Sequence, residues 1–353
     1  MNRFLSCIIV IASSILCIAQ PVSKISPGKP WHDSKGELIN AHGFCVIQHE
    51  DTYYWYGAQK IPGKTENDKN EAGVSCYTSK DLYNWENKGL MISVFAADAP
   101  PELAKAFILD RPKVIHHQRT GKWIMYFKLY PPKEEGGKSG KDYAYVGVAS
   151  APAPLGPFTY HGRFLGGKCN GVDSKFGTGD FAIFVDQASD VFHVCVRKPD
   201  KKLIAGKMSA DGLRPAGDYL EMQGITQHTE APALFQRGKQ LYLLGSASTG
   251  WKANPARMFV ADQLTGPWQA LPNPCQGINP HNKLGPDKTF GGQSTYIFPL
   301  PGKKDAWIAM FDINSENNPY HSPYIWLPVT FDHQNRAIIQ WQDQWDLSIF
   351  QRK

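Results

Sequence analysis

The chain has 353 residues, of which 42% are apolar and 12% aromatic, and it carries a formal net charge of +6. That length can bury the core of one large domain or of two ordinary ones. The Lys and Arg residues are scattered and mixed with acids, as in the stretch PPKEEGGKSGK, which argues against a nucleic-acid-binding surface.

The first element in chain order is an N-terminal leader. The stretch MNRFLSCIIVIASSILCIAQ combines one positive charge, an apolar run and the small residues Cys17 and Ala19. This pattern predicts a cleaved signal peptide over residues 1–19, with an anchored helix as the alternative. No later apolar run is long enough to cross a bilayer. We therefore expect a secreted or periplasmic protein without a membrane span, in which residues 20–353 form a single catalytic domain.

The cysteines that remain after removal of the leader are odd in number and irregularly spaced: Cys45, Cys76, Cys169, Cys195 and Cys275. Such spacing excludes a disulfide framework, and no pair is close enough for a zinc site. We expect mostly buried thiols, with one disulfide left open, and we assign no metal ligand and no cofactor.

Five strongly apolar or aromatic segments recur along the chain and read as strands, because each follows a polar or glycine-containing turn. They are DTYYWYGA from Asp51, GKWIMYFK from Gly121, DVFHVCVR from Asp190, KQLYLLGS from Lys239 and DAWIAMFD from Asp305. Each is preceded by another apolar run: HGFCVIQ, DRPKVIHH, DFAIFVD, EAPALFQ and QSTYIFP. Four of the five units continue with recognisable third and fourth strands, and the third unit has a degraded version.

Five units of about four antiparallel strands predict an all-β fold, a five-bladed β-propeller. No long stretch has strong helical periodicity. A pair of β-sandwiches is the alternative, but it does not explain why the same turn chemistry returns in successive units.

One polar residue stands at the same register of every leading strand, four positions before an apolar pair. These residues are His42, Asp110, Asp180, Glu230 and Gln293. In a propeller the leading strands surround the axis, so the five side chains should meet in an axial funnel. Three carboxylates held close together cannot all ionise easily, so one pKa should be raised. Glycoside hydrolysis needs such a protonated carboxyl and a second group for the water or the sugar.

The ordered motifs from about Trp31 to Trp345 resemble glycoside hydrolase family 43, and most closely its exo-β-1,3-galactanase branch. They include YYWYG, CYTSKDLYNW, RPKVIHH, DFAIFVD, EAPALF and GGQSTYIF. The resemblance implies an inverting exo-acting propeller in which Glu230 is the general acid and Asp180 orients it. The usual first-blade aspartate base is replaced by Ala41 and His42. The branch shares this absence, which implies that Gln293 acts as an unusual base in its imidic-acid form.

Two departures from the branch pattern concern the sugar-binding and water-positioning side of the pocket. Ala58 stands where a glutamate follows YYWYG, and Asp110 replaces a glutamate before RPKVI. Trp251 is the candidate sugar-stacking platform, with a core position as the alternative. His42 could bind the sugar or hold a neighbouring carboxylate.

The sequence therefore predicts a galactan 1,3-β-galactosidase that releases galactose from oligosaccharides or polysaccharides. It would act as a monomer, with Asp110 and Gln293 positioning water. The alternatives are a β-galactofuranosidase or α-L-arabinofuranosidase on the same fold, and an inactive propeller that only binds glycans.

Overall fold

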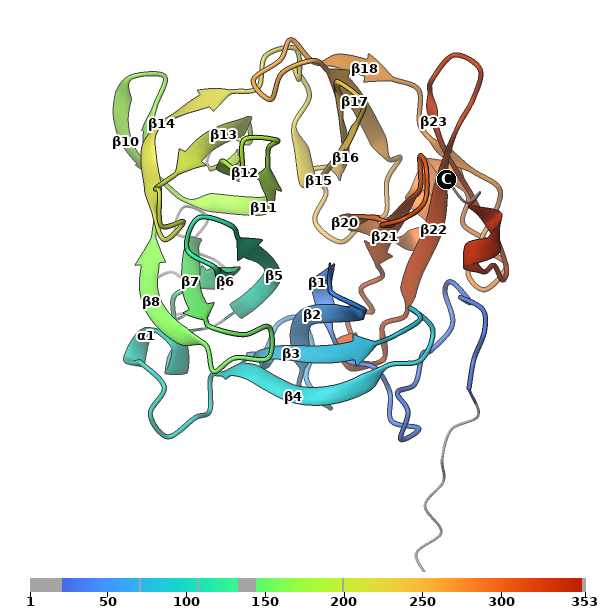
Figure 1. The fold of residues 1–353 in the computed structure, drawn as a ribbon, viewed down its shortest axis with the longest axis horizontal. Coiled ribbons are helices and arrows are strands. Elements are labelled where there is room, and N and C mark those ends of the chain that lie inside the picture. Colours follow the sequence, from blue (N-terminus) through green and yellow to red (C-terminus); the bar gives the residue numbers. More distant parts are fainter. Residues whose placement is uncertain (1–20, 70, 107, 133–143, 199, 351–353) are drawn as a thin grey trace, which may run out of the picture.

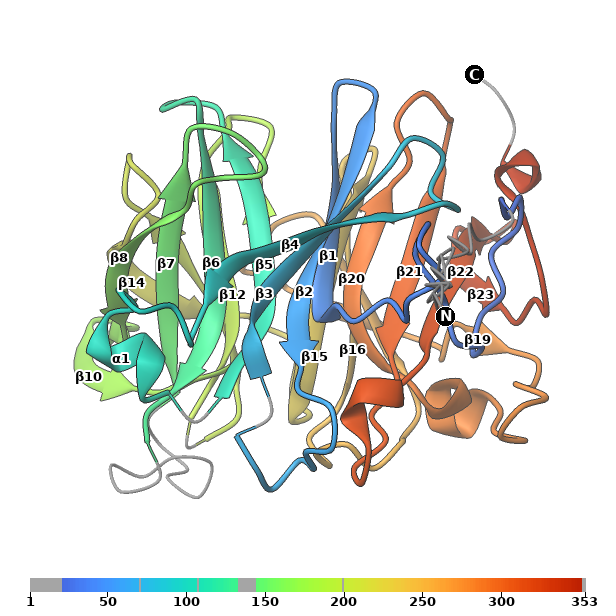
Figure 2. The same ribbon diagram turned by 90° about the horizontal axis from the view of Figure 1, so that it is seen from below.

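The protein is described by a computed structural model that covers residues 21–69, 71–106, 108–132, 144–198 and 200–350. The predicted leader lies outside these ranges. Figure 1 looks down an axis that is surrounded by five sheets, and Figure 2 shows the same sheets from the side. The predicted five-bladed β-propeller is confirmed. In the described ranges no helix is long and apolar enough to span a membrane.

Blades 1, 2 and 4 are four-stranded antiparallel meanders whose spatial order follows the chain. Blade 1 contains β1 (His42–His49), β2 (Thr52–Lys60), β3 (Glu71–Ser79) and β4 (Glu86–Ser93), and it is followed by α1 (Pro101–Ala104). Blade 2 contains β5 (Ile108–His117), β6 (Lys122–Tyr130), β7 (Tyr145–Ala151) and β8 (Thr159–Phe164). Blade 4 contains β15 (Thr229–Arg237), β16 (Gln240–Ala247), β17 (Arg257–Ala261) and β18 (Gln269–Leu271).

Blades 3 and 5 carry extra strands that the repeat pattern did not predict. Blade 3 contains β9 (Gly166–Cys169), β10 (Val172–Phe176), β11 (Thr178–Val185), β12 (Val191–Arg197), β13 (Leu203–Met208) and β14 (Pro215–Glu221). Blade 5 contains β19 (Cys275–Gln276), β20 (Gln293–Pro299), β21 (Trp307–Asp312), β22 (Tyr324–Phe331) and β23 (Ala337–Gln340). Three 3-10 helices, η2 (Pro286–Gly291), η3 (Pro319–His321) and η4 (Leu347–Ile349), lie in or after blade 5. The additions β9 and β19 extend their sheets through parallel pairing with β14 and β23, and they are too short to show a period-2 pattern.

The inner strands β1, β5, β11, β15 and β20 form a closed ring, because each contacts the next and β20 contacts β1. The two ends of the described chain also meet. Ile25 and Trp345 pair through two backbone hydrogen bonds of 2.8 and 3.0 Å. The ring brings the starts of five strands that are far apart in sequence to one end of the axis.

Every inner strand is irregular near its start, where its pairing with the second strand shifts register. The shifts lie between His42 and Cys45, Asp110 and Lys113, Thr178 and Phe181, Glu230 and Ala233, and Ser294 and Tyr296. A β-bulge turns a strand and re-aims the side chain beside it. The five polar positions that share a register in the sequence therefore lie at or beside five bulges.

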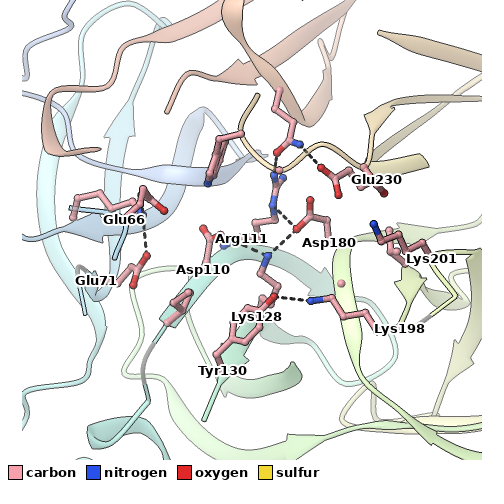
Figure 3. A pocket seen from close by; sticks show the side chains of 18 residues that line it. Glu66, Glu71, Asp110, Arg111, Lys128, Tyr130, Asp180, Lys198, Lys201 and Glu230 are labelled. Atoms are coloured by element: carbon pink, nitrogen blue, oxygen red, sulfur yellow. Dashed lines mark hydrogen bonds and ion pairs between the residues drawn. The ribbon is translucent and has the colours of Figure 1, made fainter. Parts of the chain in front are cut away.

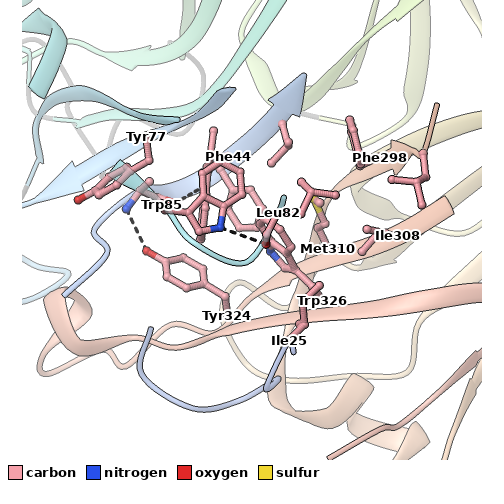
Figure 4. Close-up of a cluster of buried hydrophobic side chains, with 14 of the residues drawn as sticks. Ile25, Phe44, Tyr77, Leu82, Trp85, Phe298, Ile308, Met310, Tyr324 and Trp326 are labelled. Carbon is pink, nitrogen blue, oxygen red and sulfur yellow. Dashed lines mark hydrogen bonds between the residues drawn. The ribbon is translucent and has the colours of Figure 1, made fainter. Parts of the chain in front are cut away.

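Aromatic packing holds blade 5 against blade 1, as Figure 4 shows. The rings of Trp55 and Trp326 lie 4.8 Å apart, and Trp85 meets Trp55 edge-on at 5.3 Å. Offset and edge-to-face pairs of this kind add about 0.5–1.5 kcal/mol beyond the area they bury. Trp55, Trp123 and Trp307 are all buried, as the sequence predicts for tryptophans inside apolar strands.

All five cysteines in the part of the chain that the structure describes are buried free thiols. Burial raises the pKa of the Cys45 thiol to about 11, although Lys113 opposes the shift. The prediction of small buried hydrophobes is confirmed, and the disulfide that the sequence left open is not formed.

Candidate active site

A cavity of about 540 Å³ lies at the axis, at the end where the inner strands begin. Five of the six predicted site residues line it: Asp110, Asp180, Glu230, Trp251 and Gln293. They come from blades 2 to 5, and Figure 3 shows Asp110, Asp180 and Glu230 facing a common space. Convergence of these side chains was the central expectation from the shared register.

Asp180 is held by two buried cations. Its Oδ1 lies 2.7 Å from Lys128 Nζ and 2.9 Å from Arg111 Nε. Burial alone would raise the pKa of Asp180, but Arg111 and Lys128 outweigh it and hold the pKa well below its usual range. Asp180 is therefore an ionised carboxylate under all ordinary conditions.

Glu230 has the opposite electrostatic environment. Burial and the negative charge of Asp180 raise its pKa to about 7, against the smaller opposing effects of Arg111 and Lys128. Two neighbouring carboxyls whose pKa values are pushed apart are the signature of an acid and its charged partner. Glu230 can thus hold a proton near neutral pH while Asp180 cannot.

Gln293 connects Glu230 to Arg111, the residue that holds Asp180. Its Oε1 accepts a hydrogen bond from Arg111 Nη2, and its Nε2 donates to Glu230 Oε1 at 3.0 Å and to Ser246 Oγ at 3.1 Å. A guanidinium can donate but not accept, so Arg111 fixes which end of the Gln293 side chain is the carbonyl. Figure 3 shows this chain of contacts from Asp180 through Arg111 to Glu230.

Asp110 lies beside Asp180 at the start of blade 2. Its Oδ1 accepts a hydrogen bond from the Arg111 backbone N–H at 2.7 Å, and Lys128 Nζ is 3.8 Å from its Oδ2. Burial opposes ionisation of Asp110, but Lys128, Lys60 and Arg111 together lower its pKa. Gly43 of blade 1 permits this packing, because a Cβ there would lie 2.7 Å from Asp110 Oδ1 and its φ is +60°.

His42 differs from the other predicted residues, because its side chain is buried and does not line the cavity. Its Nδ1 lies 3.1 Å from Asp312 Oδ1, and its ring stacks on Tyr324 at 5.1 Å. The bulge after His42 directs the chain so that Gly43 N–H also donates to Asp312, at 2.6 Å. Of the two roles expected for His42, the structure shows the contact with a carboxylate, and His42 is not among the residues that line the cavity.

Trp251 lies on the cavity wall and is only half-buried, as a platform would be. The Arg111 guanidinium lies 5.7 Å from its ring centroid. The Asn314 amide lies between Glu66 and Trp251. When its nitrogen donates to Glu66, its oxygen accepts a hydrogen bond from Trp251 Nε1 at 3.2 Å. The ring is thus fixed in orientation before any ligand binds.

Sequence reasoning missed several charged residues of the wall, chiefly Arg111 and Lys128, together with Lys60, Glu66 and Glu71. A signal existed for Lys128, because it is a charged residue in the middle of the apolar stretch KWIMYFKLY. Its strand position is directly opposite Asp110. Arg111 follows Asp110 in the chain, and nothing in the sequence shows that the bulge turns its side chain toward blades 3 and 5.

The arrangement suits glycosidic bond hydrolysis, since it combines a carboxyl that can hold a proton near neutral pH with ionised carboxylates in one axial pocket. Among the described residues, no group of three or more His, Cys, Asp or Glu side chains has the geometry to hold a metal ion. The fold and this charge pattern define a glycoside hydrolase of the propeller type.

The chain belongs to glycosyl hydrolase family 43, whose family model matches residues 41–331. It is similar to a family 43 β-1,3-galactosidase solved with galactodeoxynojirimycin, with 31% identity over 92% of this chain and 100% of the other, and a TM-score of 0.80. It also resembles an exo-β-1,3-galactanase from Phanerochaete chrysosporium solved with β-1,3-galactotriose, with 26% identity over 92% and 68% of the two chains and a TM-score of 0.74. An exo-β-1,3-galactanase from Clostridium thermocellum has 27% identity over 91% and 66%, with a TM-score of 0.75. A search of curated proteins found no match.

Proposed function

We propose that this glycoside hydrolase is an inverting exo-acting galactan 1,3-β-galactosidase. The observation that carries the proposal is the pairing of Glu230, with its pKa near 7, with the ionised Asp180 in one axial pocket. The 31% identity to a β-1,3-galactosidase supports the choice of sugar and linkage.

In this mechanism Glu230 donates its proton to the glycosidic oxygen of the leaving group. Asp180 stays charged, keeps the pKa of Glu230 high before the reaction and stabilises positive charge that develops on the sugar ring. Gln293 and Asp110 position the attacking water, and the ionised Asp110 provides an acceptor for its proton. Arg111 holds Asp180 and Gln293 in place through its ion pair and hydrogen bond.

The test is a panel of substrates given to the mature protein. β-1,3-Galactotriose should yield galactose one unit at a time, whereas aryl β-galactofuranoside and aryl α-L-arabinofuranoside should yield nothing comparable. Cleavage of a furanoside in preference would show that the shorter Asp110 and the buried Ala58 admit another terminal sugar. Binding without any product would make the chain a glycan-binding module.

The pH dependence of the reaction follows from Glu230. Because it must be protonated, kcat/KM should fall as the pH rises through about 7. In Asp180→Asn the neighbouring negative charge is gone, so the pKa of Glu230 should drop and the falling limb should move to lower pH. A pH–rate profile of both proteins checks the direction, and an unmoved limb in the variant would contradict the assignment.

Trp251 is expected to bind the sugar through its ring face. Trp251→Ala should raise KM about tenfold with a smaller change in kcat, because a ring stack worth about 1–1.5 kcal/mol is lost from both ground and transition states. Trp123→Phe, at a buried position away from the cavity, is the control. Steady-state kinetics on β-1,3-galactotriose would contradict the platform role if KM did not change.

We also propose that the chain is exported as a monomer after removal of residues 1–19. Mass spectrometry of the exported protein should give a mature N-terminus at Gln20.

A further inference from the structure

Glu71 is a cavity-lining carboxyl for which the mechanism has no use. It is the first residue of β3 and pairs across the sheet with Lys60, the last residue of β2. Its side chain is only 3% exposed, and Lys60 Nζ lies 2.8 Å from its Oε1. Its second oxygen, Oε2, is buried and has no hydrogen-bond partner among the described residues.

An unpartnered carboxyl oxygen inside a protein costs free energy unless something supplies a hydrogen bond. Glu71 is part of the cavity wall, so a small turn of its carboxyl would bring Oε2, which has almost no exposed surface, to a ligand in the cavity. The negative charge of Asp110 raises the pKa of Glu71, so the two carboxyls are close enough to interact through their charges. Lys60 also lies 3.4 Å from Glu66, which completes a polar wall on blade 1.

The chemistry of this wall selects a neutral hydroxyl as the partner. A cation is disfavoured because Lys60 already neutralises Glu71 at 2.8 Å, and an anion gains no net attraction because acidic and basic residues line the cavity in equal number. A sugar hydroxyl can donate to Oε2 when Glu71 is ionised and can accept from it when Oε2 carries a proton, because Oε1 already accepts from Lys60. Burial raises the pKa of Glu71 to about 7, with Lys60 opposing the shift, so both forms are populated near neutral pH.

The position of Glu71 relative to the acid indicates which part of the sugar it meets. Glu230 belongs to blade 4 and Glu71 to blade 1, and Figure 1 places these blades across the axis from each other. The acid must lie at the anomeric end of the terminal sugar. In a pyranose ring the carbon opposite C1 is C4, with C3 beside it, so the C4 and C3 hydroxyls are the ones placed toward the wall of blade 1.

We propose that Glu71 Oε2 accepts a hydrogen bond from the C3 or C4 hydroxyl of the non-reducing terminal sugar, and that Glu71 is a specificity-determining residue. This inference rests on the proposed exo-acting function. Ala58 of the first blade is fully buried and offers no polar group, so the Lys60–Glu71 pair supplies the polar groups on this blade. Lys60 is itself positioned by Asn40, whose amide exchanges two 2.8 Å hydrogen bonds with the Lys60 backbone.

The test compares Glu71→Gln with the wild type on β-1,3-galactotriose and on two analogues that lack the terminal 3- or 4-hydroxyl. On the parent sugar, kcat/KM should fall about 10- to 150-fold, as expected when a hydrogen bond to a charged acceptor is lost. On one of the two deoxy analogues the variant and the wild type should have nearly equal kcat/KM values. The double variant Lys60→Met/Glu71→Met, which leaves no unpaired charge from this pair, should show the same selectivity.

If kcat/KM fell equally on all three sugars, Glu71 would only support the fold. If kcat/KM fell on none of them, the proposal would also be overturned. A binding measurement separates this result from failure of the proposed function. In Glu230→Gln, calorimetry with free galactose and its 3- and 4-deoxy forms reports the Glu71 contact even if the wild type cleaves no galactan. When Glu71→Gln is added to Glu230→Gln, the affinity for galactose should fall at least tenfold. The affinity for one of the two deoxy sugars should not change.

Discussion

Glu230→Gln is expected to lower kcat on β-1,3-galactotriose by about 10²- to 10⁴-fold, the usual contribution of a positioned general acid. The amide fills the same space and can still hydrogen-bond to Gln293 Nε2 through its oxygen, but it has no proton to give to the leaving group. Substrate affinity should change little. Stopped assays of galactose release, with isothermal titration of galactose into the variant, measure the two effects separately.

A substrate whose leaving group needs no protonation gives the sharpest control for Glu230. A galactosyl fluoride or dinitrophenyl galactoside should recover most of its rate in Glu230→Gln, whereas the exposed variant Glu37→Gln should behave as wild type on every substrate. The folded pKa of Glu230 lies above its ordinary value, so its contribution to stability is present at low pH and lost as the pH rises through about 7. Glu230→Gln should therefore be at least as stable as the wild type above pH 7. Equal loss on the activated and natural substrates would contradict the role of acid.

Arg111→Met is expected to lower both stability and activity. Arg111 is buried among Asp110, Asp180, Glu230 and Asp312, whose charges raise its pKa against the effect of burial. Removing one member of a buried ionic group leaves the others uncompensated and costs about 3–5 kcal/mol of unfolding free energy. Urea unfolding measures this loss, and the variant should release no measurable galactose because Asp180 and Gln293 lose their common partner.

Arg111→Lys separates charge from geometry at the same position. It keeps the positive charge near Asp180 but cannot bridge to Gln293 with a planar fork. We expect it to regain most of the stability and little of the activity. If Arg111→Met were as stable as the wild type, the buried charges would not be balanced in the way that the structure shows.

The repeat pattern was sufficient to predict the propeller and the axial position of the site. Five leading strands carry a polar residue at one register, and a propeller brings that register to one place. The same reasoning could not predict what a side chain does after the bulge. His42 follows the register as well as Glu230 does, yet its ring packs on Asp312 and Tyr324 instead of facing the cavity.

Charge balance inside the pocket was also beyond the sequence pattern. Lys128 and Arg111 keep Asp180 ionised, and the charge of Asp180 together with burial raises the pKa of Glu230, but the proximity of these groups depends on contacts between blades 2 and 3. Glu71 lies in no recognised motif, and only the structure shows that Lys60 pairs with one of its oxygens while the other has no partner among the described residues. Such pairs are set by three-dimensional neighbours that local sequence does not encode.

The most direct test of the whole account is the configuration of the sugar first released from β-1,3-galactotriose, followed by proton NMR before mutarotation. An acid and an opposed water predict that the β-linked terminal residue appears as α-galactose. Initial release of β-galactose, or no release of galactose at all, would contradict the proposed inverting exo-galactanase.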